Sequence, residues 1–278
     1  MSIFMTIFLG IVQGITEFLP ISSSGHLSIL QNFINLNYAE QDHLFFDVLL
    51  HLGTLVSICI FYRKDLYTMV TDTVKFIRGR RNYEYDDARV TPSFRLVLLV
   101  AIATLPLLFV LPLKNKIESL YYNTTFIGFA LIITGALLFV SDKLTSGHKT
   151  EKNMTVREAL IVGIVQAIAI IPGLSRSGTT ISTGLASNLN RDFAVRFSFL
   201  LSIPAVLGAT FVSFISALKA GVNWALAPMY LIGFIVSAVV GYFSLGLIRK
   251  LIADGNFGKF SYYCWIVGAL TIILSLIF

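Results

Sequence analysis

Long apolar runs alternate with short polar segments along most of the chain. Each of six continuous runs is close to the length of about 20 residues that an α-helix needs to cross a bilayer. The pattern therefore predicts six membrane-spanning helices in an all-α polytopic membrane protein. The predicted spans are Phe45–Tyr62, Phe94–Leu113, Thr125–Val140, Phe197–Leu218, Pro228–Ile248 and Tyr262–Phe278.

Two further apolar stretches are interrupted by helix-breaking and polar residues. The first stretch covers residues 3–21 and the second covers residues 159–189. Proline and glycine interrupt a helix, and freed backbone groups are tolerated at membrane depth only where protein or a wet cavity satisfies them. No basic residue precedes the first stretch, so it is not expected to be a cleavable signal peptide. The interruptions are Gly10, Gln13, Gly14, Glu17 and Pro20 in the first stretch, and Pro172, Gly173 and Arg176 in the second.

The composition agrees with a membrane protein. Of 278 residues, 56% are hydrophobic and 13% are charged, whereas an ordinary soluble domain has about a quarter of its residues charged. Such a chain cannot cover a water-facing surface with polar groups. The composition excludes a disordered protein and, despite a net charge of +6, a nucleic-acid-binding module. Cys59 and Cys264 lie in apolar runs and are expected to pack as small apolar side chains.

The Lys and Arg residues predict the orientation, because cytoplasmic segments of membrane proteins are enriched in them. Fifteen of the 21 basic residues fall in three segments, 63–95, 142–157 and 249–260. If the six runs span and the interrupted stretches do not, these segments share one side, and Lys114, Lys116 and Lys219 share the other. We expect the basic segments in the cytoplasm, with the N-terminal stretch and both termini outside.

The two interrupted stretches are copies of one another. When the sequence is shifted by 153 positions, residues 10–27 align with residues 163–180 without a gap, and eight of the eighteen positions are identical. Matching Ile and Val residues arise easily by chance, but Gln, two Ser and two Gly in register do not. The identical pairs are Gly10/Gly163, Ile11/Ile164, Val12/Val165, Gln13/Gln166, Ile15/Ile168, Ser22/Ser175, Ser24/Ser177 and Gly25/Gly178.

The repeat predicts the architecture. Each copy consists of one interrupted stretch and three spans, with boundaries at 1–145 and 146–278. Three crossings are an odd number, so the second copy must enter the membrane from the opposite side, which is an inverted-topology repeat. We expect each stretch to form a re-entrant helix–loop–helix, and the two loops to meet near the bilayer midplane.

The two loops would together form a site for an anion. Gln13 and Glu17 lie four residues apart and share a helical face. Arg176 offers a planar fork that suits phosphate oxygens, and it needs an anionic partner at membrane depth. Glu17 is expected to pair with it when the site is empty. The remaining polar and small residues are Ser22, Ser23, Ser24, Gly25 and His26 in the first loop, and Ser175, Ser177, Gly178, Thr179 and Thr180 in the second.

Structural roles are alternatives for several of these residues. Any single Ser or Thr in a membrane helix is commonly a packing residue or is bonded to its own turn, and the Glu17–Arg176 pair could serve stability alone. Asp47 and His51 are expected to pair with one another. The alternative is that they line the outer mouth of the site. Arg196 is either an interfacial anchor or a second phosphate contact.

The residues of both loops resemble the motifs of one family. The run from Gln13 to His26 resembles the (E/Q)xxxE-FLP-SS-x-GH motif of the undecaprenyl-diphosphate phosphatases of bacteria, the bacitracin-resistance family, and the run from Pro172 to Thr180 resembles their PGxSRSxxT motif. The resemblance implies hydrolysis of undecaprenyl diphosphate to the monophosphate, which recycles the lipid carrier of cell-wall synthesis and confers bacitracin resistance. It also implies dependence on a divalent cation, Mg or Ca, and a fold with an inverted repeat and re-entrant loops.

Roles for individual residues follow as hypotheses. Arg176 would clamp the terminal phosphate, and Glu17, with Gln13, would hold the cation or act as acid and base. Either His26 activates Ser23 as the nucleophile, or His26 itself takes the phosphoryl group or activates water; we favour the Ser23/His26 pair. The remaining oxygens would be held by Ser22, Ser24, Gly25, Gly173, Ser175, Ser177 and Thr180.

The same reasoning predicts the surroundings of the protein. We expect a multi-pass protein of the bacterial plasma membrane whose site opens to the extracytoplasmic side. Its partners would be undecaprenyl diphosphate and bilayer lipid, with no nucleic acid, and a homodimer is one candidate oligomeric state.

Three rival interpretations remain. A polyprenyl-phosphate transporter or flippase could use the same midplane site, because broken helices in inverted repeats are typical of transporters. Acid-phosphatase-like lipid phosphatases are disfavoured, because Ser182 stands where their SR-x5-H motif needs His and the chain has no Arg-Pro dipeptide. A structural membrane protein without a substrate is the least favoured.

Overall fold

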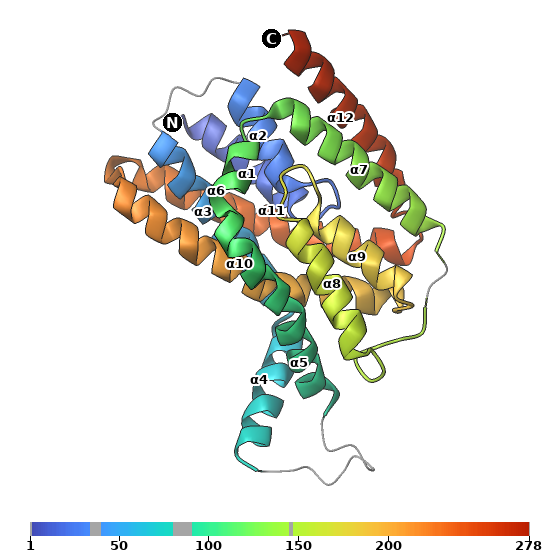
Figure 1. Cartoon of the computed structure of the whole chain (residues 1–278). Coiled ribbons are helices and arrows are strands. Elements are labelled where there is room, and N and C mark those ends of the chain that lie inside the picture. Colours follow the sequence, from blue (N-terminus) through green and yellow to red (C-terminus); the bar gives the residue numbers. More distant parts are fainter. Residues whose placement is uncertain (1, 34–39, 80–90, 145–146, 278) are drawn as a thin grey trace.

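The computed structural model describes residues 2–33, 40–79, 91–144 and 147–277, and these residues form a helical bundle (Figure 1). Across the described ranges the only β-type contact given is a bridge between Lys149 and Leu189. The first half contains α1 (Ile3–Thr16), α2 (Ser23–Phe33), α3 (Glu40–Phe61), α4 (Arg63–Ile77), α5 (Pro92–Thr104), η1 (Leu105–Leu113), α6 (Lys114–Leu120) and α7 (Thr124–Asp142). The second half contains α8 (Val156–Ile168), α9 (Arg176–Ala186), α10 (Arg191–Ala220), η2 (Trp224–Leu226), α11 (Ala227–Ala253) and α12 (Lys259–Ile277).

All six predicted spans are helices. Five helical segments in the described part are long and apolar enough to cross a membrane, and the sixth is a bent pair, α3 followed by α4. The bend between these two helices is 76°. Large apolar side chains such as Phe109 and Phe243 are exposed along the spans, as expected of helices that face lipid rather than water.

The bend and the helix α4 were not predicted from the sequence. The sequence analysis treats residues 63–95 as a basic loop, because eight of them are Lys or Arg. In the structure α4 buries Met69, and Phe76 stacks on Phe94 of α5 with ring centroids 4.2 Å apart. A narrow apolar face therefore makes part of the basic segment helical, and α4 and α5 project together from the bundle (Figure 1).

Both interrupted stretches form a helix–loop–helix, as predicted. The loops 17–22 and 169–175 separate α1 from α2 and α8 from α9. The outer ends of the second unit lie together, because the backbone N–H of Asn190 donates a hydrogen bond to the Lys149 carbonyl oxygen at 2.9 Å. A capping box of Thr155 and Glu158 begins α8. The second stretch therefore returns to the end of the bundle from which it started.

Small residues let the first helix of each unit approach the opposite half of the chain. A Cβ at Gly10 of α1 would lie 3.0 Å from Val236 of α11. A Cβ at Gly163 of α8, the repeat partner of Gly10, would lie 2.3 Å from the Ala103 carbonyl oxygen of α5. Each unit thus packs against the second span of the other half, and this packing carries the two loops into the middle of the bundle.

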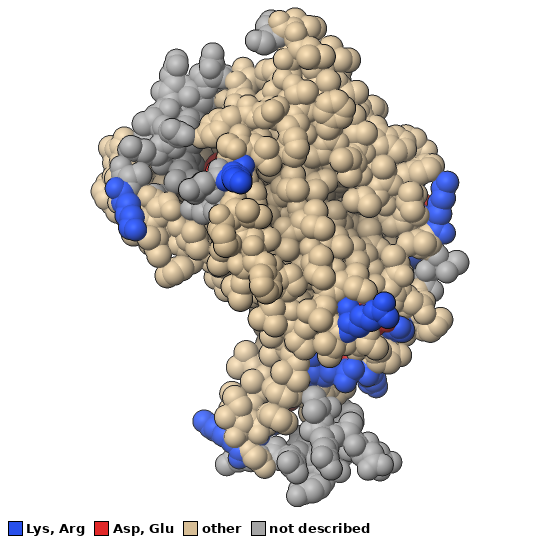
Figure 2. Space-filling view, viewed as in Figure 1, with Lys and Arg blue, Asp and Glu red and all other residues tan. Residues whose placement is uncertain are grey.

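The described parts of the three basic segments lie at one end of the bundle. Arg95 donates to the Met154 carbonyl at 2.8 Å, which joins segments 63–95 and 142–157. Arg249 of the third segment pairs with Asp192 at the start of α10 at 3.0 Å. Figure 2 shows a broad surface without charged residues, with several groups of Lys and Arg in its lower part and further ones at its left and right edges and upper left.

Candidate active site

The loops of the two helix–loop–helix units touch one another. A Cβ at Gly25 would lie 3.1 Å from the Cα atom of Gly173. Ser177 donates to the Leu19 carbonyl oxygen across the interface at 3.3 Å. Gly173 itself has φ +91° and leaves 2.6 Å between an added Cβ and Ala130, so only glycine fits this turn without strain. The predicted meeting of the two loops is confirmed.

The same hydrogen bonds begin the second helix of each unit. Ser22 Oγ accepts from the backbone N–H of Gly25 at 3.2 Å, and Ser175 Oγ accepts from the backbone N–H of Gly178 at 3.1 Å. Each serine also lies near the serine two positions later, at 3.4 Å from Ser24 in the first loop and 3.3 Å in the second. Ser22 and Ser175 therefore act as N-caps, and the repeat extends to individual contacts.

Glu17 is the centre of the polar cluster between the loops. Its side chain is 6% exposed, and one carboxylate oxygen is hydrogen-bonded by Arg176 from the other half of the chain. The second oxygen accepts from Ser23 Oγ at 2.6 Å and from Gln13 Nε2 at 3.0 Å. His51 Nε2 lies 3.8 Å from the same oxygen. The predicted Glu17–Arg176 pair and the shared face of Gln13 and Glu17 are both present.

Arg176 has a second fixed contact. Its Nη1 atom donates to the Ser202 carbonyl oxygen of α10 at 3.5 Å, and about a fifth of the side chain is exposed, at 21%. The guanidinium is thus held from two sides while part of it stays accessible. A phosphate that enters the site can accept from this fork in place of Glu17.

His26 is fixed by partners other than Ser23. Its Nδ1 lies 2.8 Å from the Ser22 carbonyl oxygen, which can only accept, so the proton of a neutral ring is on Nδ1. Nε2 then accepts from the Tyr263 hydroxyl, 2.8 Å away, and the two rings stack at 5.6 Å. In this structure the Ser23 hydroxyl donates its hydrogen bond to Glu17, rather than to His26 as the sequence analysis favoured.

The predicted binding hydroxyls of the second loop are bonded to protein. Ser175 Oγ caps α9, Ser177 Oγ reaches the Leu19 carbonyl, and Thr180 Oγ1 contacts the Arg176 carbonyl at 2.8 Å and Ser198. All three side chains are buried. These hydrogen bonds hold the loop and Arg176 in place. To bind substrate, the three hydroxyls would have to give up their hydrogen bonds to protein groups. Ser24 is partly exposed at the site.

Two tyrosines and a histidine join the site without a sequence motif. Tyr263 of α12 contacts His26, and His51 of α3 faces Glu17 while its Nδ1 donates to the Asp47 carbonyl oxygen at 2.8 Å. The Asp47 carboxylate instead accepts from Gln31 at 3.0 Å, so the alternative that His51 lines the site is the one observed. Burial raises the pKa of Tyr121, which lies near Ser24, to about 12.

Arg196 does not belong to this site. It pairs with Asp65 at 3.5 Å and with Glu151 at 2.8 Å, both at the basic end of the bundle. The alternative of a second phosphate contact beside Arg176 is therefore wrong for this residue.

A divalent cation fits the cluster only together with other oxygen ligands. The described residues contain no group of three or more His, Cys, Asp or Glu side chains that could hold a metal ion. However, Gln13 Oε1 is buried and has no hydrogen-bond partner, and it belongs to the same cluster as the Glu17 carboxylate. Two protein oxygens suit Mg²⁺ that is bound mainly through phosphate oxygens and water.

The chain is similar to proteins of one family over almost its whole length. Residues 6–270 match the family described as bacitracin resistance protein BacA. A protein from Methanosphaera stadtmanae named undecaprenyl-diphosphatase is 42% identical over 100% of this chain and 99% of its own length. Proteins of the same name from Halothermothrix orenii, 40% identical over 100% of both chains, and Methanobrevibacter smithii, 39% identical over 99% of both, are also similar.

Proposed function

The chain belongs to the bacitracin resistance protein BacA family, and we propose that it hydrolyses undecaprenyl diphosphate to undecaprenyl phosphate and phosphate. The relatives named undecaprenyl-diphosphatase match it over the full length. The observation that carries the proposal is the contact of Glu17 with both Arg176 and Ser23. It places an acid, a hydroxyl and a guanidinium within one buried cluster, as phosphoryl transfer requires.

Arg176 binds and stabilises the terminal phosphate. Its fork donates to phosphate oxygens and offsets the negative charge that develops on them during transfer. When phosphate draws the guanidinium away from Glu17, the carboxylate loses a positive neighbour and becomes a stronger base. Substrate binding thus prepares Glu17 to accept a proton.

Ser23 is the nucleophile in this proposal. Its hydroxyl gives its proton to Glu17 while Oγ bonds to the terminal phosphorus. The bond from that phosphorus to the bridging oxygen breaks, and its electron pair leaves with undecaprenyl phosphate. Water then attacks the phosphorus held on Ser23. The bond from phosphorus to Ser23 Oγ breaks as Glu17 returns its proton to Oγ; Glu17 then takes the proton of the attacking water and releases it to solvent. His26, held by Tyr263 and the Ser22 carbonyl, lines the site and orients the phosphate.

Glu17 and the unpaired Gln13 oxygen are the residues that would hold a cation, Mg or Ca. When bound, such a cation neutralises charge on the diphosphate. The two protein oxygens alone form an incomplete shell, so we expect the cation to bind weakly without substrate and tightly with it.

The two halves, 1–145 and 146–278, form an inverted repeat in this proposal. The equivalent N-caps at Ser22 and Ser175 and the equivalent packing of Gly10 and Gly163 support it. The first half supplies the acid, the hydroxyl and the imidazole, whereas the second half supplies Arg176. The protein is a multi-pass membrane protein, and we place its basic end in the cytoplasm and the opening of the site outside.

The experiment is phosphate release by the purified protein from undecaprenyl diphosphate in detergent, with and without Mg or Ca. Release that requires Arg176, tested with Arg176→Ala, supports the phosphatase and its site. Binding of the lipid that depends on Arg176 without any release would instead support the transporter. Unchanged release by folded Arg176→Ala would contradict the assigned site.

A further inference from the structure

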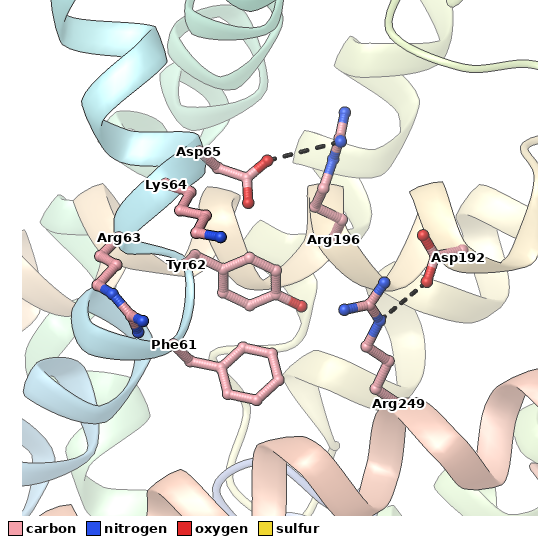
Figure 3. Close-up of a pocket in the computed structure, with 8 residues that line it drawn as sticks. All are labelled: Phe61, Tyr62, Arg63, Lys64, Asp65, Asp192, Arg196 and Arg249. Carbon is pink, nitrogen blue, oxygen red and sulfur yellow. Dashed lines mark hydrogen bonds and ion pairs between the residues drawn. The ribbon is translucent and has the colours of Figure 1, made fainter.

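A polar cavity lies at the basic end of the bundle (Figure 3). It has a volume of about 330 Å³ and forms where α3 bends into α4, beside the start of α10 and the end of α11. His51 at the active site and Phe61 at the cavity are both on α3, separated by about 15 Å of helix at 1.5 Å per residue. The lining residues are Phe61, Tyr62, Arg63, Lys64, Asp65, Asp192, Arg196 and Arg249.

Aromatic side chains separate this cavity from the active site. Phe18, which follows Glu17 in the chain, meets Phe199 edge to face with ring centroids 5.7 Å apart. Phe199 in turn contacts Tyr62 of the cavity at 6.3 Å. All three rings are buried, at 0%, 2% and 4% exposure respectively. The cavity is therefore a distinct site, because a packed aromatic layer closes it from Glu17.

The cavity has more positive than negative charge. Its two carboxylates are already paired, Asp192 with Arg249 at 3.0 Å and Asp65 with Arg196 at 3.5 Å. Arg196 is shared with Glu151, which lies outside the lining, at 2.8 Å. Arg63 and Lys64 form no ion pair with any carboxylate in the described part of the chain, and both side chains are exposed. These two cations give the cavity the capacity to bind an anion.

An apolar surface continues from one wall of the cavity. The ring of Phe61 meets that of Tyr242 on α11 edge to face, with centroids 5.7 Å apart. Phe243, whose ring meets that of Tyr242, and Leu247 lie four residues apart on one face of α11. Both are exposed, as is Ile60 on α3. A basic cavity next to an exposed apolar face matches a molecule with a charged head and a hydrocarbon tail.

We propose that this cavity binds the phosphate headgroup of an anionic membrane lipid. Basic cavities between helices at the cytoplasmic end of membrane proteins are suited to such headgroups. The phosphate lies against Arg63 and Lys64, and an acyl chain follows the exposed face of Phe243 and Leu247. Free phosphate has the same charged group but lacks the chain, so it would use only half of this surface.

The test uses the full-length purified protein and native mass spectrometry. The protein in neutral detergent is titrated with phosphatidylglycerol and, separately, with zwitterionic phosphatidylcholine. We expect the double substitution Arg63→Gln with Lys64→Gln to weaken the tightest phosphatidylglycerol site about tenfold. The matched control is Lys75→Gln with Arg78→Gln, which removes the same charge from the last turn of α4 and its C-cap, outside the cavity. It should leave this affinity within about twofold.

The outcomes distinguish the sources of the anion. Selective weakening by the cavity variant, with no displacement of the lipid by excess inorganic phosphate, supports the proposal. Equal weakening by both variants would assign the effect to general surface charge and overturn it. Displacement by inorganic phosphate at concentrations comparable with the lipid would make the cavity a site for the free ion. Equal binding of phosphatidylglycerol and phosphatidylcholine would exclude a site that selects an anionic headgroup. Thermal melting of both variants confirms that they are folded.

Discussion

At the scale of single residues, the buried Glu17–Arg176 pair has a cost in free energy. Both side chains lie inside the bundle, and taking two charges out of water is expensive even when they pair. The pair nevertheless leaves part of Arg176 accessible, at 21% exposure, where a purely structural pair would be better enclosed. This exposure supports the proposal that Arg176 pairs with Glu17 in the empty site and binds phosphate when substrate enters.

Arg176→Lys tests the need for the planar fork. Lysine keeps the positive charge but cannot make two parallel hydrogen bonds to phosphate. We expect kcat/KM for undecaprenyl diphosphate to fall by roughly 10²- to 10³-fold, the loss typical of removing a transition-state donor, with a small change in melting temperature. Arg157→Lys, on the exposed face of α8, is the control and should retain full activity. An Arg176→Lys enzyme with activity within threefold would rule out bidentate recognition.

At the scale of elements, the loop of the second helix–loop–helix unit owes its shape to a glycine turn and to contacts with α7. Gly173 occupies a left-handed backbone conformation and is closed in by Ala130 and Ile127 of α7. Thr134 of α7 also accepts from the Ser175 backbone N–H at 3.1 Å and donates to the Gly173 carbonyl at 3.1 Å. Arg176 therefore owes its position to a loop anchored on α7.

Gly173→Ala should combine a steric clash with backbone strain. We expect the free energy of unfolding to fall by about 2–4 kcal/mol, more than the roughly 1 kcal/mol for left-handed strain alone. Gly221→Ala is the matched control, because Gly221 has φ +97° but nothing within 4 Å of an added Cβ. Denaturation in a mild detergent measures both. Equal destabilisation by the two substitutions would show that α7 does not press on the loop.

The first turn of α8 should respond to acid. Partial burial raises the pKa of Glu158, but hydrogen bonds from Lys149 and Thr155 outweigh it and bring the pKa below its ordinary value of 4.5. A carboxyl whose pKa is lowered by folding stabilises the protein above its unfolded pKa, and this stabilisation is lost as the pH falls through the folded pKa.

Melting temperatures from pH 7 to pH 3 test this contribution with Glu158→Gln. At pH 7 the variant should melt lower than the unmodified protein, and the difference should shrink below pH 4.5 as Glu158 takes up a proton. A difference that stays constant over the whole range would show that the charge of Glu158 adds nothing to stability.

At the scale of the whole molecule, the packing supports the inverted repeat. Helix α1 packs on α11 and α8 packs on α5, in each case the second span of the other half, and the described parts of the basic segments lie at one end of the bundle. These two features make a definite prediction of sidedness. Residue 152 in the second basic segment and residue 116 in α6 should lie on opposite sides of the membrane.

Cysteine accessibility measures this sidedness. Lys116→Cys and Lys152→Cys, two exposed positions, are placed separately in a chain whose Cys59 and Cys264 are replaced by Ser. A membrane-impermeant maleimide on intact cells should label position 116 and should label position 152 only after permeabilisation. Labelling of both positions from outside would contradict the six-span topology, and the opposite pattern would reverse the orientation.

The sequence by itself determined the spans, the two interrupted units and the pairing of Glu17 with Arg176. These features follow from local information: the length of apolar runs, the positions of Gly and Pro, and the cost of an unpaired charge in hydrocarbon. The repeat added one long-range fact, because two similar loops in halves of opposite orientation must approach each other.

The tertiary structure alone decided which other side chains reach the site. Tyr263 and His51 lie on ordinary apolar helices and carry no motif, and His26 is directed to Tyr263 rather than to Ser23 by the orientation of α12. The bend between α3 and α4, and the basic cavity beside it, likewise depend on contacts between distant helices. Hydrophobic periodicity states which face of a helix is buried, but only packing decides which neighbour that face meets.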